Sequence, residues 1–347
     1  MVKPGQAGIR SYAIGLSRAL GERPDLRVTV LVAANNQDDW GQCEVVCTKL
    51  RNQDFAHRLV WRAKRVPDLV RWLGADALLV LAPEPVTRGS VSQGIVIHDL
   101  GPLLAPAVYG RRRFFSYLAT IRRAIHSVDH VFTPSHATKL DVLRWAGAGQ
   151  SVSVAGPILR PFDQGEEDQR NRPKHPDRGS FALYVGALLP HKNVSTVVRA
   201  FGSSVVGTGC IPPRLVIVGP DYGGEVEKVM AHAGNAVEHR GFVAQDELNE
   251  LYDQAAVLVF PSLFEGFGLP LLEALSRGTP TLASAIPALL EVGRDVTAYV
   301  TRPTDVDAWL EGLDLPRSPS PGGLVSWDGA AEAIAVSFQG GNRSRIA

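Results

Sequence analysis

The sequence lacks several features that would place the chain in a particular class of protein. No apolar run approaches the ~20 residues that a helix needs to cross a bilayer, and the first residues hold no apolar stretch typical of a signal peptide. Cysteine is scarce, because the 347 residues include only Cys43, Cys47 and Cys210, with no metal-ligand spacing. We therefore expect a cytoplasmic protein with free thiols and no disulfide framework.

A large net charge is also missing, since the whole chain carries +1. This balance hides an asymmetry: residues 1–160 hold 21 Lys and Arg against 12 Asp and Glu, and residues 161–347 hold 15 against 23. Arginines cluster at 111–113 and 122–123. The basic half can contact an anionic membrane or a phosphate-bearing acceptor, or it can be a solvated helix face. No nucleic-acid-binding module is recognisable, so we expect no nucleic-acid partner.

The sequence does contain short valine-rich runs that alternate with amphipathic stretches, which predicts buried parallel strands alternating with helices. In the first half we predict strands at 27–33, 77–81, 94–97 and 130–133, and helices at 11–20, 54–72, 113–126 and 137–145. In the second half we predict strands at 181–185, 214–218, 237–242, 257–260 and 281–283, and helices at 194–201, 225–233, 246–255 and 269–276. Asp246 is the predicted N-cap of its helix.

Residues 161–180 interrupt the alternation with a polar stretch rich in proline and charge, which is typical of a linker. We therefore predict an α/β protein with two Rossmann-like, doubly wound parallel-sheet domains that face a central cleft. The N-terminal domain spans residues 1–160 and the C-terminal domain residues 181–325. No strand is predicted ahead of the first helix, so either the sequence starts late or the fold tolerates the loss of that strand.

The first candidate for chemistry is the segment that follows the predicted strand 257–260. Its glycines permit a close backbone approach, and the helix that begins near Pro270 offers free N–H groups and a favourable dipole to an anion. Glu265 stands in the loop and Glu273 about one turn into the helix, where carboxylates can accept hydrogen bonds from hydroxyls. This pattern indicates a phosphate and sugar site, and the alternative is a loop charge beside a solvated helix residue.

A second candidate is Lys192, which follows the predicted strand 181–185 and precedes the next helix. A lysine at that position can hold a diphosphate and stabilise it as a leaving group. Alternatively, Lys192 is a surface residue beside a helix cap formed by Asn193 or Ser195.

Six motifs in this order resemble the family 4 retaining glycosyltransferases of GT-B fold, also called glycosyl transferases group 1. The motifs are Tyr184-Val185-Gly186 through Lys192-Asn193, Val218-Gly219, Gly241-Phe242-Val243, Phe260-Pro261-Ser262, the run from Glu265 to Pro270, and Glu273-Ala274. The resemblance is dense over residues 181–300 and continues weakly to 326–327. It implies that residues 326–347 form the family's closing C-terminal helix, which packs back onto the N-terminal domain.

The resemblance implies a role for each matched residue of the C-terminal domain. Lys192 would bind the donor diphosphate, Glu265 would lie near the transferred sugar and the reaction centre, and Glu273 would bind the nucleotide ribose. Phe242 and Val243 would lie beside the base.

The same resemblance places a loop under the sugar and phosphates, and this loop consists of Gly266, Phe267, Gly268 and Leu269. One position departs from the family pattern. Many members carry an arginine directly after the glycine of the first motif as a second phosphate clamp, and this chain has Ala187. A small residue there is closer to a subgroup that includes many GDP-mannose-dependent mannosyltransferases, so GDP-mannose is the favoured donor.

The N-terminal half resembles the family more loosely. The run that begins at Gly8 is similar to the family's glycine loop, which approaches the donor phosphates, and it puts Arg10 on the acceptor side. His98 matches a histidine that contacts the sugar near the reacting carbon, with Asp99 next to it on the acceptor side. Ser135 matches a serine ahead of a helix. His98 can equally be a structural histidine, and Ser135 a plain N-cap.

Together these matches imply a retaining hexosyltransferase with His98, Lys192 and Glu265 at its reaction centre. It would transfer a hexose, with mannose favoured, from a nucleotide diphosphate sugar to a hydroxyl of a glycan, glycolipid or lipid-linked acceptor in polysaccharide or cell-envelope biosynthesis. No Asp-x-Asp pair stands at the end of a predicted strand, so we expect no metal and no cofactor.

Three alternatives share the fold: a non-catalytic or degenerate nucleotide-sugar-binding protein, a sugar epimerase, and a phosphorylase, which is usually much longer. The basic half is compatible with a cytoplasmic protein that contacts the inner membrane face peripherally.

Overall fold

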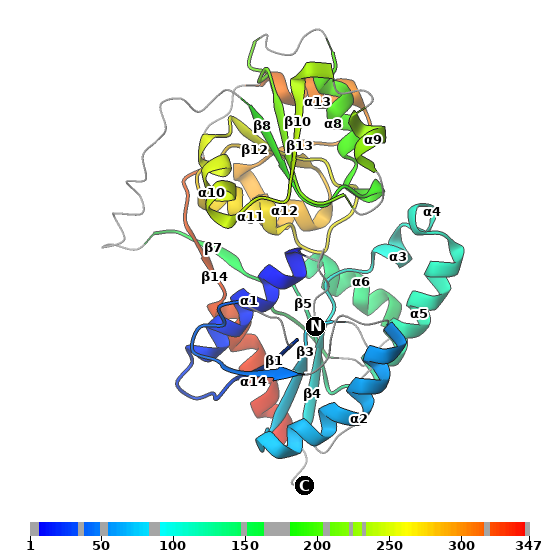
Figure 1. The fold of residues 1–347 in the computed structure, drawn as a ribbon, viewed down its shortest axis with the longest axis vertical. Coiled ribbons are helices and arrows are strands. Elements are labelled where there is room, and N and C mark those ends of the chain that lie inside the picture. The colour runs from blue at the N-terminus through cyan, green and yellow to red at the C-terminus, as the bar shows by residue number, and fades with distance from the viewer. Residues whose placement is uncertain are drawn as a thin grey trace. The chain divides into compact units, whose positions relative to one another are not determined.

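A computed structural model of the chain describes residues 7–33, 38–48, 55–82, 91–146, 151–162, 181–203, 209–221, 225–230, 234–315 and 320–343. The chain divides into two compact units, one formed by residues 1–157 with 327–347 and the other by residues 158–326 (Figure 1). The chain therefore crosses between the units twice, at 157–158 and at 326–327. The predicted linker lies outside the described residues from position 163 onward, as do the residues ahead of the first helix.

A six-stranded, wholly parallel sheet forms the centre of the second unit, with the strand order β10-β9-β8-β11-β12-β13. These strands are β8 (Ala182–Val185), β9 (Leu215–Val218), β10 (Val237–Gly241), β11 (Val257–Phe260), β12 (Thr281–Ser284) and β13 (Ala298–Val300). The chain begins in the middle with β8, winds outward to β10, returns to β11 and winds outward again. This is the predicted doubly wound arrangement, and the winding direction reverses between β8 and β11.

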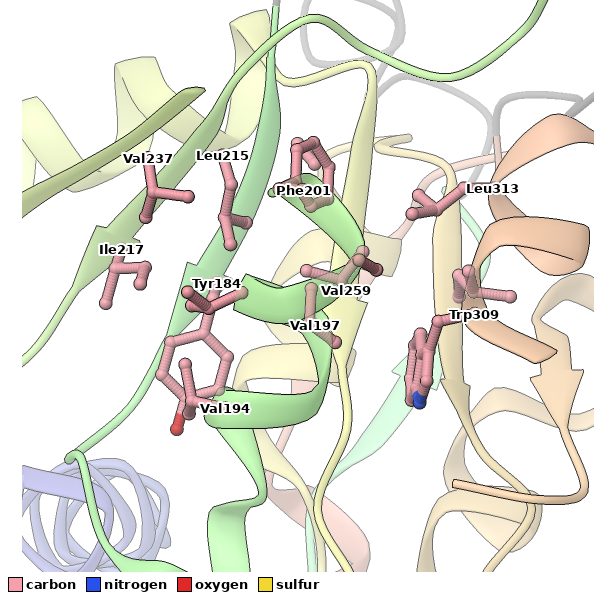
Figure 2. Packing of buried hydrophobic residues seen from close by; sticks show 14 of the residues in the cluster. Tyr184, Val194, Val197, Phe201, Leu215, Ile217, Val237, Val259, Trp309 and Leu313 are labelled. Carbon is pink, nitrogen blue, oxygen red and sulfur yellow. The ribbon is translucent and has the colours of Figure 1, made fainter. Parts of the chain in front are cut away.

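Helices cover both faces of this sheet. They are α8 (Val194–Phe201), α9 (Glu225–Met230), α10 (Gln245–Gln254), α11 (Leu269–Ser276), α12 (Pro287–Gly293) and α13 (Val306–Asp314). Figure 2 shows one face, where Phe201 of α8 and Trp309 of α13 belong to the same buried cluster as Tyr184 of β8 and Val259 of β11. Leu183 points to the opposite cluster, under α10 and α11. Both faces of β8 are thus buried, which explains why its sequence is apolar without alternation.

The first unit contains a four-stranded parallel sheet, β3-β4-β5-β6, and a separate parallel pair, β1-β2. The strands are β1 (Thr29–Ala33), β2 (Glu44–Thr48), β3 (Ala77–Val80), β4 (Ser92–Val96), β5 (His130–Thr133) and β6 (Val152–Val154). The helices are α1 (Ala7–Gly21), α2 (Phe55–Leu73), α3 (Gly101–Leu104), α4 (Pro106–Tyr109), α5 (Arg111–His126), α6 (His136–Ala146) and α14 (Asp328–Arg343). The core of the sheet lies between β4, β5 and α5.

Helix α14 comes from the far end of the sequence and packs against α1 in the first unit (Figure 1). Gly15 makes this approach possible, because an added Cβ would lie 2.4 Å from the ring of Trp327. Directly beyond the two crossings, β7 (Ile158–Arg160) pairs antiparallel with β14 (Leu324–Ser326). Residues 158 and 326 are partners in this pair, so the two crossings begin next to each other.

Two local predictions are wrong. The expected glycine loop that begins at Gly8 forms the first turns of α1, because Ile9, Tyr12 and Ala13 extend the apolar helical pattern upstream. Asp246 is the second residue of α10 and not its N-cap, which is Ala244. At that position an acidic side chain still interacts favourably with the positive end of the helix dipole.

Candidate active site

The loops after β8 and β11 are hydrogen-bonded to each other at the point where the winding of the sheet reverses. The backbone N–H of Leu263 donates to the carbonyl of His191 at 2.8 Å. Asn193 adopts a left-handed backbone conformation, with φ of 54°, and its side-chain amide donates to the carbonyls of Pro261 and Pro303 at 3.2 and 2.7 Å. These bonds fix the short helical turn Pro190–Lys192 against the loop after β11. Doubly wound sheets bind their ligands at this position.

Lys192 and Glu265 meet between these two loops. The Nζ atom of Lys192 lies 2.5 Å from Oε1 of Glu265, and the hydroxyl of Ser262 donates to the same oxygen at 2.7 Å. The two charged side chains are 18% and 12% exposed, so they are sheltered yet reachable from solvent. The ammonium also lies 6.0 Å from the centre of the Phe260 ring. A pair of this kind can offer a cation to phosphate oxygens and a carboxylate to hydroxyl groups.

Three glycines allow the backbone around this pair to approach closely. Gly186 and Gly219 have φ values of 153° and 144°, and a Cβ on Gly219 would lie only 1.9 Å from the carbonyl oxygen of Gly186. Gly268 is the N-cap of α11 with φ of 109°, and its added Cβ would meet Leu289 at 2.6 Å. The motif glycines are therefore required by the fold of the loops themselves.

Glu273 lies in α11 and is held by a tyrosine. The hydroxyl of Tyr252 donates to Oε2 of Glu273 at 2.8 Å. Burial raises the pKa of the Glu273 carboxyl, while the Tyr252 hydrogen bond and the Arg277 charge oppose that rise. Arg277 itself pairs with both carboxylate oxygens of Asp253 at 2.5 and 2.8 Å. Glu273 is thus a partly buried carboxylate held by Tyr252 and not the solvated helix residue considered as the alternative.

Phe242 follows β10 at the same carboxyl edge of the sheet and is 73% exposed. Gly241 before it has φ of 65°, and Val243 after it packs partly against the core. A large aromatic ring exposed at this edge can stack on a planar base.

In the first unit, His98 follows β4, and its imidazole forms a hydrogen bond with a backbone carbonyl. Its Nε2 atom lies 3.1 Å from the carbonyl oxygen of Leu81, and because that oxygen only accepts, Nε2 carries the proton. Burial lowers the pKa of His98 to about 4. The ring is therefore neutral at pH 7, and its Nδ1 atom is a hydrogen-bond acceptor.

The other predicted residues of the first unit have structural partners. Arg10 forms an ion pair with Asp38, and a carboxylate oxygen of Asp99 accepts from the backbone N–H of Gly101 at 2.8 Å. Ser135 is fully buried, and its hydroxyl accepts from the backbone N–H of residue 138 at 3.0 Å, so it caps α6. Gly8 faces open space on α1.

Comparison with known proteins agrees with this geometry. Residues 165–315 match the family Glycosyl transferases group 1. The chain is 30% identical over 311 residues to D-inositol 3-phosphate glycosyltransferase of Streptomyces scabiei, covering 81% of this chain and 67% of that one. The chain belongs to the glycosyl transferases group 1 family. This glycosyltransferase is also 27% identical over 297 residues to the O-antigen chain mannosyltransferase RfbU of Salmonella typhimurium, covering 78% of this chain and 80% of RfbU.

Solved structures confirm the GT-B fold. Sucrose-phosphate synthase from Thermosynechococcus elongatus superposes with a TM-score of 0.67 at 19% identity, over 99% of this chain and 93% of that one. Anabaena Alr3699/HepE in complex with UDP and glucose superposes with a TM-score of 0.64 at 16% identity, over 99% and 97%. Among the described residues, no helix has both the length and the apolar character that spanning a bilayer requires.

Proposed function

We propose that this glycosyltransferase binds a nucleotide diphosphate sugar at the carboxyl ends of β8 and β11 and transfers its hexose with retention of configuration. The contact between Lys192 and Glu265 carries the proposal, because it puts a sheltered cation and a carboxylate at the reversal point of the sheet. Glu273, held by Tyr252, would accept hydrogen bonds from the ribose hydroxyls. Phe242 would stack on the base.

The reaction needs negative charge to be stabilised on the departing diphosphate. As the bond between the anomeric carbon and the phosphate oxygen breaks, the Lys192 ammonium and the N-terminal amides of α11 stabilise that charge. The acceptor oxygen then bonds to the oxocarbenium-like carbon on the same face, and its proton passes to the departing phosphate oxygen. His98 would accept a hydrogen bond from a sugar hydroxyl through Nδ1. In this scheme no metal ion is required.

Mannose from GDP-mannose is the donor that we favour. RfbU is named as an O-antigen chain mannosyltransferase, and so is a relative from Escherichia coli, mannosyltransferase B, which is 34% identical over 131 residues, covering 37% of this chain and 34% of that one. The small Ala187 directly after Gly186 is a second argument. The words "O-antigen chain" in both names favour a glycan acceptor, and we propose a glycan or lipid-linked acceptor in the synthesis of a cell-envelope polysaccharide.

The test is a thermal-shift titration with GDP-mannose, UDP-glucose and a dTDP-sugar, followed by analysis of the product with the effective donor. We expect stabilisation by one donor, GDP-mannose, and a product with the donor's anomeric configuration. Lys192→Met should abolish the shift, whereas Lys228→Met, on the exposed side of α9, should keep it. No shift with any nucleotide sugar refutes the donor site. Binding without transfer indicates a non-catalytic protein, and a new sugar on the nucleotide indicates an epimerase.

We further infer that α5 contacts an anionic membrane that presents the acceptor. Helix α5 contains no acidic residue, and its Phe115 is 62% exposed. Four exposed arginines accompany this ring: Arg111, Arg112, Arg122 and Arg123. At about 100° per residue these five side chains fall within an arc of roughly 120°. An apolar ring flanked by arginines suits a surface of anionic lipid headgroups, where each cation contributes about 1 kcal/mol.

Vesicle sedimentation tests this surface. Vesicles of phosphatidylcholine with phosphatidylglycerol should bind the protein at low salt, and pure phosphatidylcholine vesicles should not. Arg122→Glu combined with Arg123→Glu should weaken binding at least tenfold, while Arg144→Glu on α6 should not. Equal binding to both kinds of vesicle, or to neither, contradicts the inference.

A further inference from the structure

Tyr12 occupies a central position in the first unit. Its ring meets the His98 imidazole edge to face, with centroids 4.8 Å apart and planes at 89°. It meets the Trp327 indole in the same way, at 5.0 Å and 84°. The Tyr12 hydroxyl donates to the carbonyl oxygen of Ala155, and the residue is only 2% exposed.

Two of these three partners, Ala155 and Trp327, lie next to the crossings between the units. Ala155 lies two residues before the first crossing, and Trp327 is the first residue after the second. On the far side of the crossings the chain continues directly into the paired strands β7 and β14. The Tyr12 side chain therefore contacts both segments that lead into the second unit, at Ala155 and at Trp327. The same side chain contacts His98.

The orientation of His98 depends on this contact. The bond from Nε2 to the carbonyl of Leu81 fixes one atom of the ring and leaves rotation about that bond. The Tyr12 edge restricts this rotation, because edge-to-face contacts are directional. The Tyr12 hydroxyl cannot leave Ala155 without losing its buried partner. A movement of either crossing segment therefore displaces the Tyr12 ring and with it the plane of the imidazole.

We propose that Tyr12 is a positioning residue that sets the orientation of His98 and couples it to the two chain crossings. The inference rests on the role given to His98 in the proposed function. Tyr12 is only 2% exposed, so in this proposal it acts through the imidazole and not on the donor directly. A tyrosine that only fills the core would instead contribute to stability and leave the turnover of the folded enzyme unchanged.

A double-mutant cycle between residues 12 and 98 separates the two roles. Tyr12→Phe keeps the ring and removes the bond to Ala155, so we expect a ~3- to 10-fold fall in kcat, the rate equivalent of one hydrogen bond. Tyr12→Leu should lower kcat further. In a His98→Ala background neither change should lower kcat again, because the route through the imidazole is already broken. The donor KM should change less than kcat, since the proposed contacts to the diphosphate, ribose and base lie in the second unit.

The matched control is Tyr299→Phe, which also removes a tyrosyl bond to a backbone carbonyl, that of Leu289 at 3.1 Å, in the second unit. It should leave kcat unchanged. Independently, Tyr12→Leu should raise the pKa of His98 in an NMR titration, because the ring loses part of its cover. Additive losses in the cycle, or a Tyr12→Phe effect confined to thermal stability, overturn the inference. A wild-type kcat for His98→Ala overturns it as well, while the donor site at β8 and β11 is judged by its own titration.

Discussion

Gly219→Ala tests how the donor loops are built. Gly219 directly follows β9, with φ of 144°, and its backbone lies close to that of Gly186, the residue after β8. An added Cβ would lie 1.9 Å from the carbonyl oxygen of Gly186, and ordinary contact begins near 3.4 Å. The two segments must therefore separate by about 1.5 Å, because the obstacle is backbone and cannot rotate away.

Two costs combine in this variant. Backbone strain at a positive φ contributes about 1–3 kcal/mol, and overpacking contributes about 1–3 kcal/mol more. The two costs total about 2–6 kcal/mol, and for a unit of this size each kcal/mol lowers the melting temperature by about 2–4 °C, so a fall of roughly 4–24 °C is expected. Lys192 lies in the loop that follows Gly186, and a displacement of about 1 Å can cost ~100-fold in rate. We therefore expect kcat/KM for the donor to fall by about that factor.

Differential scanning fluorimetry and initial-rate kinetics measure both effects. Gly234→Ala is the matched control, since Gly234 also has a positive φ, 54°, but its added Cβ would meet nothing within 4 Å. The control should lose about 1 kcal/mol and keep its rate. If Gly219→Ala is no worse than this control in both measurements, the close approach of β8 and β9 does not shape the site.

Three further predictions concern single side chains. Gly15→Ala brings a Cβ to 2.4 Å from the Trp327 ring. Thermal unfolding should therefore show a loss of ~1–3 kcal/mol in the free energy of unfolding, although alanine has the better helix propensity. A gain in stability would show that the ring moves aside freely. Burial raises the pKa of Glu273, so the folded chain binds that proton more tightly than the unfolded chain and loses stability as pH rises from about 4.5. In urea unfolding, Glu273→Gln should gain stability relative to the parent protein over that rise, and parallel curves contradict this. Burial lowers the pKa of His98 to about 4, so the folded chain binds this proton less tightly than the unfolded chain. The protein therefore loses stability as pH falls from 6.5 towards 4, by up to about 3 kcal/mol. In urea unfolding, His98→Asn should not show this loss.

Local sequence signals were sufficient for the elements that carry the proposed donor site. The predicted strand 257–260 and helix 269–276 coincide with β11 and α11, because a buried valine-rich run and a glycine-proline start are complete within a few residues. The three-residue strands β6, β7, β13 and β14 were not predicted, since so few residues carry no periodicity. The predicted helix begins at residue 11, whereas α1 begins at Ala7. Gly8 is typical of a loop, but a glycine in the first turn of a helix is tolerated.

The contacts within the site could not be read from the sequence. Lys192 and Glu265 are 73 residues apart, and their direct contact depends on β8 and β11 being neighbours in the sheet. Tyr252 of α10 donates a hydrogen bond to Glu273, and the Tyr12 ring of α1 contacts His98, yet neither tyrosine stands in a recognisable motif. Such partners depend on tertiary packing, which local patterns do not encode.

Isothermal titration calorimetry with GDP, UDP and dTDP tests the central claim most directly. We predict that GDP, and neither UDP nor dTDP, binds with one-to-one stoichiometry to the parent protein and to Lys228→Met. Binding should be lost or weakened at least tenfold in Lys192→Met, because the diphosphate loses its cation. Failure of all three nucleotides to bind, or equal binding by Lys192→Met and the parent protein, would contradict a donor diphosphate held between β8 and β11.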